Sequence, residues 1–417
     1  MKHPVVHVIG AGAAGLAAAQ ALVSSNLCDV VVHESKSHPG GRRRSFYDAA
    51  LGIDVDAGNF PILSGWKSVL ALIEAAGARG EWREEGEPGV AFADLTTGER
   101  WRLTPNAGRT PWWLLSSRRR GKPFRLADYW GARRLLSPSP TATVASCAPR
   151  GAAYDRLWRP LVLAALNCPP ESASAKLAGS VLRELLKTGG AGMRLLTPIR
   201  HFGRAFIEPL TKRLMREGAA LRFERKLVSI EAGPERVTGL EFAHDRIDLS
   251  PRDAVILATP WPVSASLVPG LSPSGDASAA LTIHFAAPPP TKSEAVVGAV
   301  NGAFDWLFCY RDRISITIND AAAKIDSARD TLSAECWRGV AALTGLSDEL
   351  PAWRVVLSRR ASFLATPEEV RRRPSPCTNW RNLFLAGAYV GGPQPEGLEG
   401  SVRSGERAAK LWRDFCV

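Results

Sequence analysis

Residues 5–22 read VVHVIGAGAAGLAAAQAL, and the organisation of the whole chain follows from this stretch. Its first five residues are apolar and mostly β-branched, as in a buried parallel strand. Its last seven are mostly strong helix formers. In the turn between them, Gly10 allows a sharp bend, Gly12 allows close approach of a pyrophosphate, and Gly15 allows helix and strand to pack. The stretch therefore predicts a strand, a glycine turn and a helix whose N-terminus attracts phosphate.

A GxGxxG pattern alone also occurs in purely structural turns, so a dinucleotide site needs further support. A second feature provides it. An apolar strand over residues 30–33 ends at Glu34, which lies 19 residues after Gly15. A carboxylate at this distance is expected to accept hydrogen bonds from ribose hydroxyls. The alternative is an exposed charge at a strand end, and the combination of strand, turn and spacing disfavours it.

Two short motifs then point to a known superfamily. Gly40-Gly41-Arg42-Arg43 follow shortly after Glu34, and Asp56-Ala57-Gly58-Asn59 come later. With them the sequence resembles the flavoprotein superfamily of amine oxidases and phytoene-type desaturases, in which the arginine after the paired glycines meets the pyrophosphate. A guanidinium fork suits phosphate oxygens. Since residues 42–44 are three successive arginines, at least one of them is expected to be an ordinary surface residue.

The C-terminal region carries the second half of this resemblance. Residues 382–387 predict a strand that meets a glycine turn, and residues 396–401 lead into a helix that we expect to end near Trp412. In the superfamily the N-terminus of this helix points at the pyrimidine side of the flavin, where its dipole stabilises negative charge. One departure is that Ala388 follows Gly387, where the superfamily usually has Asp, so one expected cofactor contact is missing.

The resemblance implies FAD as cofactor and indicates which residues hold it. In the superfamily a strand and turn at the position of residues 221–230 contact the adenine through the backbone, which places Val228 there. The FAD-binding residues implied in this way are Gly10, Gly12, Ala13, Ala14, Gly15, Glu34, Ser35, Gly41, Arg42, Arg43, Gly58, Asn59, Val228, Gly387, Leu398 and Glu399.

Residues 154–175 narrow the resemblance. An apolar helix over residues 154–168 is followed by Pro169-Pro170 and by a second helix expected at 172–187. This pattern resembles the hydroxysqualene dehydroxylases of bacterial hopanoid biosynthesis. Asn167 either caps the first helix, which we favour, or binds a substrate oxygen. One departure is the stretch at residues 56–60, which reads DAGNF where these dehydroxylases tend to have Asp-Asn-Gly-Gln-His.

This resemblance implies a C30 isoprenoid substrate. An allylic hydroxyl would leave as water while reduced FAD delivers a hydride to the same carbon. Two alternatives remain open: an FAD-dependent desaturase that oxidises another polyisoprenoid, and a non-catalytic FAD-fold protein that carries a lipid. The proton donor is not identified. Tyr389 is a weak candidate, and Asp305 and Tyr310 are others, but each is more readily explained as structural. No second strong GxGxxG is present for a nicotinamide, so the electron donor to FAD is unknown.

The order of predicted elements favours an α/β fold. We expect a Rossmann-like FAD-binding domain from residues 1–85, 205–270 and 371–417, and an α+β substrate-binding domain from residues 86–204 and 271–370. Other predicted elements are a hairpin at 90–103, helices at 66–77, 209–218, 262–267 and 326–343, and strands at 253–260, 281–285, 314–318 and 353–358. Residues 137–151 are expected to form a loop.

Composition limits the remaining possibilities. Hydrophobic content of 45% and charged content of 23% are typical of a folded soluble protein. We expect no transmembrane helix, since no apolar run of about 18 residues occurs, and no secretory leader. The seven cysteines show no metal-ligand spacing, which indicates reduced thiols in the cytosol and no metal site.

The charge is unevenly distributed. The net charge is +12, and residues 109–136 hold eight basic residues and one acid, a net of +7. The same segment contains Trp112, Trp113, Leu114 and Leu115. Tryptophan beside leucine and arginine suits a membrane interface. We therefore expect a cytoplasmic protein that is peripheral on the inner face of the cell membrane and binds anionic lipid rather than nucleic acid, although core tryptophans with solvated arginines are the alternative.

Overall fold

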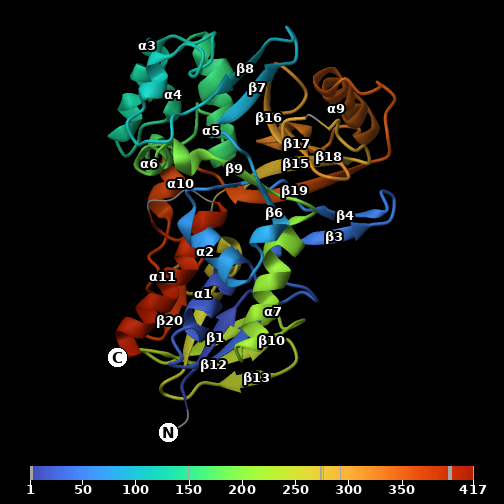
Figure 1. The fold of residues 1–417 in the computed structure, drawn as a ribbon. Coiled ribbons are helices and arrows are strands. Elements are labelled where there is room, and N and C mark those ends of the chain that lie inside the picture. The colour runs from blue at the N-terminus through green and yellow to red at the C-terminus, as the bar shows by residue number, and fades with distance from the viewer. Residues whose placement is uncertain are drawn as a thin grey trace.

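The computed structural model of the chain describes residues 3–148, 150–272, 275, 277–291, 293–392 and 397–416. It has a lower part built on a five-stranded sheet and an upper part built on a seven-stranded sheet (Figure 1). Both ends of the chain lie at the lower part, so the chain passes into the upper part and returns. This arrangement confirms the predicted α/β fold class.

The five-stranded sheet is parallel throughout and confirms the nucleotide-binding fold. Its order is β10-β2-β1-β14-β20. The predicted strands 5–9, 30–33, 253–260 and 382–387 all lie in it. The strands are β1 (Val5–Ile9), β2 (Asp29–His33), β10 (Ala220–Arg222), β14 (Ala254–Leu257) and β20 (Leu383–Leu385).

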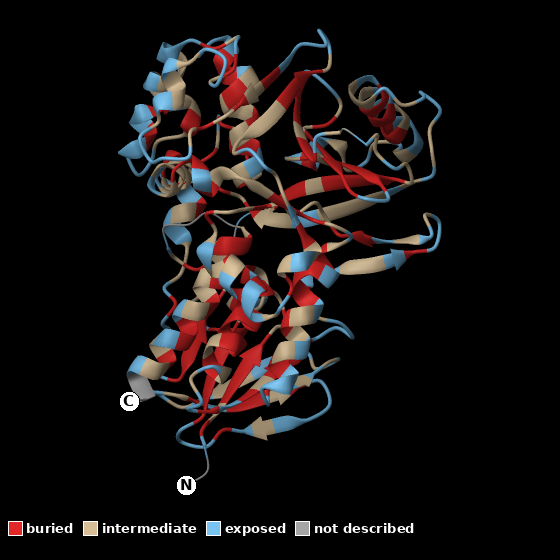
Figure 2. Ribbon diagram, in the orientation of Figure 1, coloured by how far each residue is buried: buried red, intermediate tan, exposed pale blue. Residues whose placement is uncertain are grey.

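Helices cover one face of this sheet and a small antiparallel sheet covers the other. The helical face forms one apolar core, which Figure 2 shows as buried ribbon, with α1 (Ala13–Val23), α2 (Lys67–Ala75), α7 (Glu208–Arg216) and α11 (Leu398–Cys416). The opposite face packs on α8 (Trp261–Leu267) and on β11 (Leu227–Ala232), β12 (Val237–Phe242) and β13 (Arg246–Asp248). Burial on both faces explains why the parallel strands are apolar runs without alternation.

Two predicted elements in this part differ in extent from the structure. The strand and turn expected at 221–230 cover parts of two strands, because Glu224 has φ of +56° and turns the chain between them. β10 pairs in parallel with β2, whereas β11 pairs with β12. The C-terminal helix also continues past Trp412 to Cys416.

The seven-stranded sheet forms the upper part in the order β19-β15-β18-β17-β16-β7-β8. The predicted hairpin is present, with Gly98 at its turn, and its strand β7 pairs in parallel with β16. One face packs on α9 (Arg329–Thr344). The strands are β7 (Val90–Asp94), β8 (Arg100–Leu103), β15 (Ala277–Phe285), β16 (Val296–Val300), β17 (Trp306–Cys309), β18 (Ile314–Ile318) and β19 (Trp353–Phe363).

Helices from residues 112–188 lie beside this sheet. The predicted break at Pro169-Pro170 is confirmed, since it separates α5 (Arg159–Leu166) from α6 (Ala175–Thr188). The expected loop at 137–151 contains a single helical turn, α4 (Val144–Cys147). The more exposed elements are η3 (Trp112–Leu115), α3 (Leu126–Trp130) and η4 (Gly131–Leu136), which lie with α4 and α6 at the upper left of Figure 1.

The two large sheets draw on separate parts of the sequence. The five-stranded sheet uses only residues within 1–85, 205–270 and 371–417, and the seven-stranded sheet only residues within 86–204 and 271–370. The division into two domains on these boundaries stays our proposal. Across the described residues, no helix is long and apolar enough to span a bilayer, and no group of His, Cys, Asp or Glu could hold a metal ion.

Candidate functional site

The glycine turn after β1 has the packing that its spacing predicts at Gly10 and Gly15, and it is open at Gly12. Gly10 has φ of +107°, and a Cβ there would lie 2.8 Å from the carbonyl oxygen of Ala258. A Cβ on Gly15 would lie 1.8 Å from the carbonyl oxygen of Gly10, so only glycine lets α1 pack this closely. A Cβ on Gly12 would meet nothing within 4 Å. Gly10 and Gly15 therefore shape the turn, and open space lies at Gly12.

The N-terminus of α1 is the candidate phosphate site. Gly12 is its N-cap, and no side chain caps the helix there. Ala13 and Ala14 form its first turn and are buried. Unsatisfied N–H groups at a helix N-terminus favour an anion. Gly12, Ala13 and Ala14 therefore form the helix N-terminus at which the sequence predicts a pyrophosphate.

Glu34 lies directly after β2 and faces the glycine turn. It is 8% exposed, and its Oε2 accepts a hydrogen bond of 2.8 Å from the Ala11 N–H. Its Oε1 accepts from the Lys36 N–H at 3.0 Å and from the Ser35 hydroxyl at 3.2 Å. A carboxylate has about four acceptor sites, so lone pairs remain for ribose hydroxyls. The alternative of an exposed strand-end charge is wrong.

The paired glycines bring two arginines to the same turn. Gly40 donates its N–H to the Ala11 carbonyl at 2.9 Å, and a Cβ on Gly41 would lie 3.5 Å from the Gly12 Cα. Arg42 donates to the Ala361 carbonyl of β19 at 2.9 Å, and the Arg43 guanidinium lies 5.6 Å from the centre of the Phe60 ring. Both cations are therefore close to the loop expected to hold phosphate, and Arg42 also links it to the upper sheet.

The C-terminal motif packs directly on the N-terminal one. Gly387 follows β20 with φ of +148° and donates its N–H to the Ser404 hydroxyl at 3.0 Å. A Cβ on Gly405 would lie 2.1 Å from the Ala14 carbonyl oxygen, so α11 approaches α1 at van der Waals distance. Leu398 begins α11 and is buried. Sequence reasoning missed Gly405, although an isolated glycine inside a predicted helix signals close packing.

The side chain of Glu399 has a different role from the one implied by the resemblance. Its carboxylate accepts from the backbone N–H groups of Ser68 at 3.3 Å and Val69 at 3.0 Å. Arg403 completes its contacts with a bond of 2.7 Å. Glu399 therefore caps α2, because these N–H groups belong to the first turn of that helix. Any contact with the flavin would come from the backbone of Glu399.

Arg373 orders the loop after Gly387, and sequence reasoning missed it. Its guanidinium donates to the carbonyl oxygens of Ala388 at 2.8 Å, Val390 at 2.7 Å, Gly392 at 3.1 Å and Tyr389 at 3.3 Å. Four carbonyls around one planar cation use most of its five donors. Nothing near Arg373 in the sequence distinguishes it from the many other arginines, so no local signal identifies it.

Asn59 connects the lower part to the upper sheet. Its Nδ2 donates to the Thr317 hydroxyl of β18 at 2.9 Å, and its Oδ1 accepts from the Tyr310 hydroxyl at 2.9 Å. A Cβ on Gly58 would lie 2.9 Å from the tip of the Phe60 ring, so a larger residue there would displace that ring. The Asn59 side chain, in a turn that the resemblance assigns to FAD binding, therefore contacts the upper sheet.

Behind this turn lies a buried charged pair. Arg313 is fully buried and its guanidinium lies 3.5 Å from Asp56, whose carboxylate also accepts from the Phe202 N–H at 2.9 Å. Burial raises the pKa of Asp56, although Arg313 opposes this. His284 contacts the Asp56 carbonyl at 2.9 Å, and burial lowers its pKa to about 3. His284 is therefore neutral, and Arg313 is the cation that balances Asp56.

Val228 follows shortly after the backbone segment that is hydrogen-bonded to Glu34. It falls between Leu227 and Ser229, where the register with β12 shifts, and it is 54% exposed. The adjacent segment is tied to Glu34, because Glu34 donates to Arg222 and Arg225 donates to Glu34, both at 2.8 Å through the backbone. The position is compatible with an adenine contact, which stays a prediction.

Asn167 caps α5, as favoured from the sequence. It has φ of +47° and donates its N–H to the Leu163 carbonyl. Its amide donates to the Ala279 carbonyl and the Ser362 hydroxyl, and accepts from the Asp320 N–H at 2.9 Å. These protein partners account for its side chain, so the cap interpretation explains the residue without a substrate.

The three acid candidates have structural surroundings. Tyr389 is buried, stacks on Trp261 and bonds the Ser264 hydroxyl at 2.7 Å. Asp305 accepts from the Asn319 N–H at 2.6 Å. Burial raises the pKa of Tyr389, Tyr310 and Asp305.

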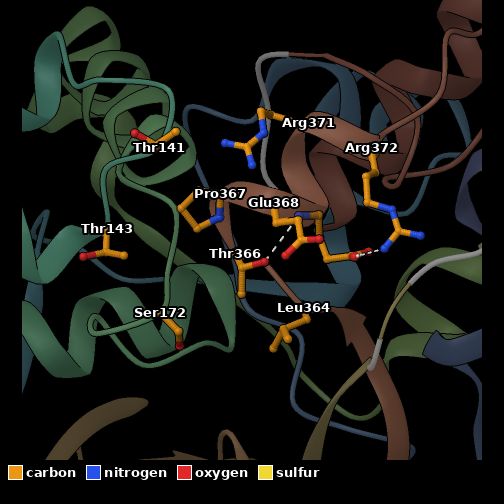
Figure 3. Close-up of a pocket in the computed structure, with 10 residues that line it drawn as sticks. Thr141, Thr143, Ser172, Leu364, Thr366, Pro367, Glu368, Arg371 and Arg372 are labelled. Carbon is orange, nitrogen blue, oxygen red and sulfur yellow. Dashed lines mark hydrogen bonds and ion pairs between the residues drawn. The ribbon is translucent and has the colours of Figure 1, made fainter.

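A pocket of about 610 Å³ is lined by none of these three candidates (Figure 3). It lies between α10 (Pro367–Arg372) and the segment around α4. In it, Glu369 accepts from Arg372 at 2.8 Å. None of the residues implied in FAD binding lines it; its lining is Thr141, Thr143, Ser172, Leu364, Thr366, Pro367, Glu368, Glu369, Arg371 and Arg372.

The residues at the lower site fit FAD. Open space at Gly12, an uncapped helix N-terminus and a fixed carboxylate at Glu34 match the pyrophosphate and the ribose. The fold and these residues define a dinucleotide-binding flavoprotein. The chain belongs to the family of flavin containing amine oxidoreductases, which matches residues 13–411. It is an FAD-dependent oxidoreductase.

Relatives and solved structures agree with this family. The chain is 40% identical to a hydroxysqualene dehydroxylase of Sinorhizobium fredii over 97% of each chain. It is 39% identical to a hydroxysqualene dehydroxylase of Rhodopseudomonas palustris, also over 97% of each chain. A variant of putrescine oxidase has the same fold, with a TM-score of 0.73 at 15% identity over 99% of each chain. The resemblance that the sequence motifs indicate is confirmed.

Proposed function

We propose that this protein converts hydroxysqualene reductively to squalene. The observation that carries the proposal is 40% identity, over nearly the full length of both chains, to a protein named hydroxysqualene dehydroxylase. The reaction replaces a carbon–oxygen bond by a carbon–hydrogen bond and releases water. FAD, when bound and reduced, supplies the hydride. The water also requires one proton, which must come from solvent or from a group not yet assigned.

The residues of the lower site would bind FAD across both sequence ends. Gly12, Ala13 and Ala14 would receive the pyrophosphate at the α1 N-terminus, and Glu34 would accept from the ribose. Arg42 would add positive charge next to the phosphates. The N-terminus of α11, at Leu398, would face the flavin ring, where a helix dipole favours negative charge.

The same FAD site is also compatible with a desaturase, so substrate turnover must distinguish the two activities. Anaerobic incubation of the protein with reduced FAD and hydroxysqualene should yield squalene with oxidation of the flavin. A desaturase would instead bleach oxidised flavin when given a saturated polyisoprenoid. A protein that purifies without flavin and turns over neither compound would support the non-catalytic alternative.

We also propose that residues 109–136 contact an anionic membrane surface. Five large apolar side chains in this segment are exposed: Trp112, Leu115, Leu126, Trp130 and Leu136. η3 and α3 pack together through Trp113 and Tyr129, whose rings are 5.6 Å apart, so the exposed groups belong to one structural unit. Exposed tryptophan and leucine next to arginine suit the headgroup region of a bilayer. A substrate with 30 carbons is almost insoluble in water, so membrane contact would let the enzyme take it directly from the bilayer.

Not all of the basic residues are free to bind lipid. Arg120 is half-buried and donates to the carbonyls of Phe124 at 3.0 Å and Leu114 at 3.1 Å, so it orders the segment. The Arg133 guanidinium lies 5.3 Å from the centre of the Trp130 ring. Arg118, Arg119 and Arg134 are exposed and are the better candidates for headgroup contacts.

A further inference from the structure

Two hydrogen bonds, one at the oxygen and one at the nitrogen, fix the orientation of the Asn59 side-chain amide. The Tyr310 hydroxyl donates to Oδ1 at 2.9 Å, and Nδ2 donates to the Thr317 hydroxyl at 2.9 Å. The nitrogen carries two N–H groups and the oxygen two lone pairs. One N–H and one lone pair are thus left over after these two contacts.

Tyr310 is held as a neutral donor. It is 2% exposed, and burial raises the pKa of its hydroxyl. The Arg313 guanidinium lies 4.0 Å from the centre of its ring, and Arg313 is anchored by Asp56, three residues before Asn59. A rigid path of contacts therefore runs from Asp56 through Arg313 and Tyr310 back to Asn59, and it fixes the amide.

Thr317 places this amide on a particular face of the upper sheet. Its neighbours Ile316 and Ile318 belong to the apolar core under α9. Because side chains alternate along a strand, Thr317 points to the opposite face, toward the turn at residues 56–60. Asn59 and Thr317 are both half-buried. Gly58 and Asn59 are both among the residues that the resemblance implies in FAD binding.

We propose that the Asn59 amide recognises the hydroxyl of the substrate. Its remaining N–H would donate to the hydroxyl oxygen, and Tyr310 and Thr317 would position it for this contact. The amide binds and orients this oxygen; it does not supply the proton. The inference rests on the proposed dehydroxylation, because only a hydroxylated substrate offers the oxygen, and it gives Asn59 a role distinct from holding FAD.

The test compares two ligands that differ by this hydroxyl. Binding of hydroxysqualene and of squalene to the FAD-loaded protein is measured for the parent, for Asn59→Leu and for Tyr310→Phe. One net hydrogen bond corresponds to about a tenfold change in affinity. Asn59→Leu should weaken hydroxysqualene binding about tenfold and leave squalene binding unchanged. Tyr310→Phe should give a smaller loss in the same direction.

Thr282→Val is the matched control. Thr282 pairs with Thr317 across β15 and β18 but has no hydrogen bond to Asn59. Its removal should leave the ratio of the two affinities unchanged. Equal weakening of both ligands by Asn59→Leu, or loss of bound FAD from that variant, would overturn the inference. If the parent neither binds nor converts hydroxysqualene, the proposed function fails; parent turnover with an unchanged ratio in Asn59→Leu fails this inference alone.

Discussion

The carboxylate of Glu34 accepts a hydrogen bond of 2.8 Å from the backbone N–H of Ala11. This contact joins the end of β2 to the middle of the glycine turn after β1. The residue expected to bind ribose thus also holds the turn expected to bind pyrophosphate. The two halves of the candidate site are coupled, so the most informative variant is one that blocks the turn without disturbing Glu34.

Gly12→Val meets this condition. A Cβ at Gly12 has no protein atom within 4 Å, so the fold should accept the side chain. The added branch would occupy the space expected for the pyrophosphate. FAD affinity, measured by titration of the apoprotein, should fall by about tenfold or more, with the thermal midpoint of the apoprotein unchanged.

Two other glycines serve as comparisons for this variant. Gly80→Val makes the same change at an open position in another part of the chain, and FAD binding should be unaffected. Gly15→Val should fail to fold, because its Cβ would lie 1.8 Å from the Gly10 carbonyl oxygen. A Gly12→Val protein that purifies with full flavin content would show that the pyrophosphate lies elsewhere.

The parts of the fold that the sequence predicts are those with local signals. β1, the turn at Gly10 and α1 follow from residue types at adjacent positions, and Gly387 marks the second motif in the same way. The resemblance also placed Arg42 next to the turn, but not its contact with Ala361, because that contact depends on residues 319 positions apart.

The features that the sequence does not predict depend on long-range contacts. Glu399 lies in a flavin motif, yet its side chain caps α2 because Ser68 is brought against it only in the folded chain. Arg373 and Arg313 are unremarkable in a chain with 53 basic residues, but each becomes the centre of a network once β20 and β18 are in place. Burial and partners, rather than residue type, define these roles.

Arg373 should control how well the loop after Gly387 holds its shape. Arg373→Ala removes donors to four carbonyl oxygens of this loop. We expect FAD affinity to fall about tenfold, with faster proteolytic cleavage within residues 388–392. Arg373→Lys keeps the charge but not the planar fork and should recover only part of the affinity.

Arg371→Ala is the control for Arg373, because Arg371 is an exposed arginine in the neighbouring helix. It should leave both readouts unchanged. If Arg373→Ala binds FAD as the parent does and resists protease equally, the loop does not depend on this residue.

Acid should destabilise the protein through its buried histidines, and His7 and His33 form a contacting pair of them. The rings of His7 and His33 are in contact on β1 and β2, with 3.1 Å between Nδ1 of His7 and Nε2 of His33. Burial lowers the pKa of His7 to about 4 and that of His33 to about 3, from about 6.5 when unfolded. The unfolded chain therefore binds more protons below pH 6.5, and stability falls as the pH drops from 6.5 toward 4.

The slope with pH tests this assignment. Each histidine should contribute about 1 kcal/mol of unfolding free energy per pH unit within this window. Urea unfolding at pH 6 and pH 5 should show a pH dependence that is smaller in a His7→Asn, His33→Gln double variant by about 2 kcal/mol per pH unit. An equal slope in parent and double variant would assign the acid sensitivity to other groups.

Binding to anionic membranes should depend on exposed charge in residues 109–136. Each Lys or Arg near such a surface contributes roughly 1 kcal/mol, so Arg118→Ser, Arg119→Ser and Arg134→Ser together should weaken vesicle binding about a hundredfold. This set spares Arg120, whose contacts with Phe124 and Leu114 order the segment. In flotation assays the parent should bind vesicles that contain anionic lipid, bind neutral vesicles weakly, and lose binding as salt rises.

A control must distinguish the effect of net charge from the effect of charge within residues 109–136. A control with Arg216→Ser, Arg252→Ser and Arg338→Ser removes the same number of exposed cations elsewhere and should bind as the parent does. Trp112→Ser with Trp130→Ser should weaken binding even at low salt, because it removes two rings that are 66% and 64% exposed and would enter the headgroup region. If both arginine sets weaken binding equally, only net charge matters. If duplex DNA competes for the parent while the tryptophan variant binds vesicles normally, this surface serves nucleic acid instead of lipid.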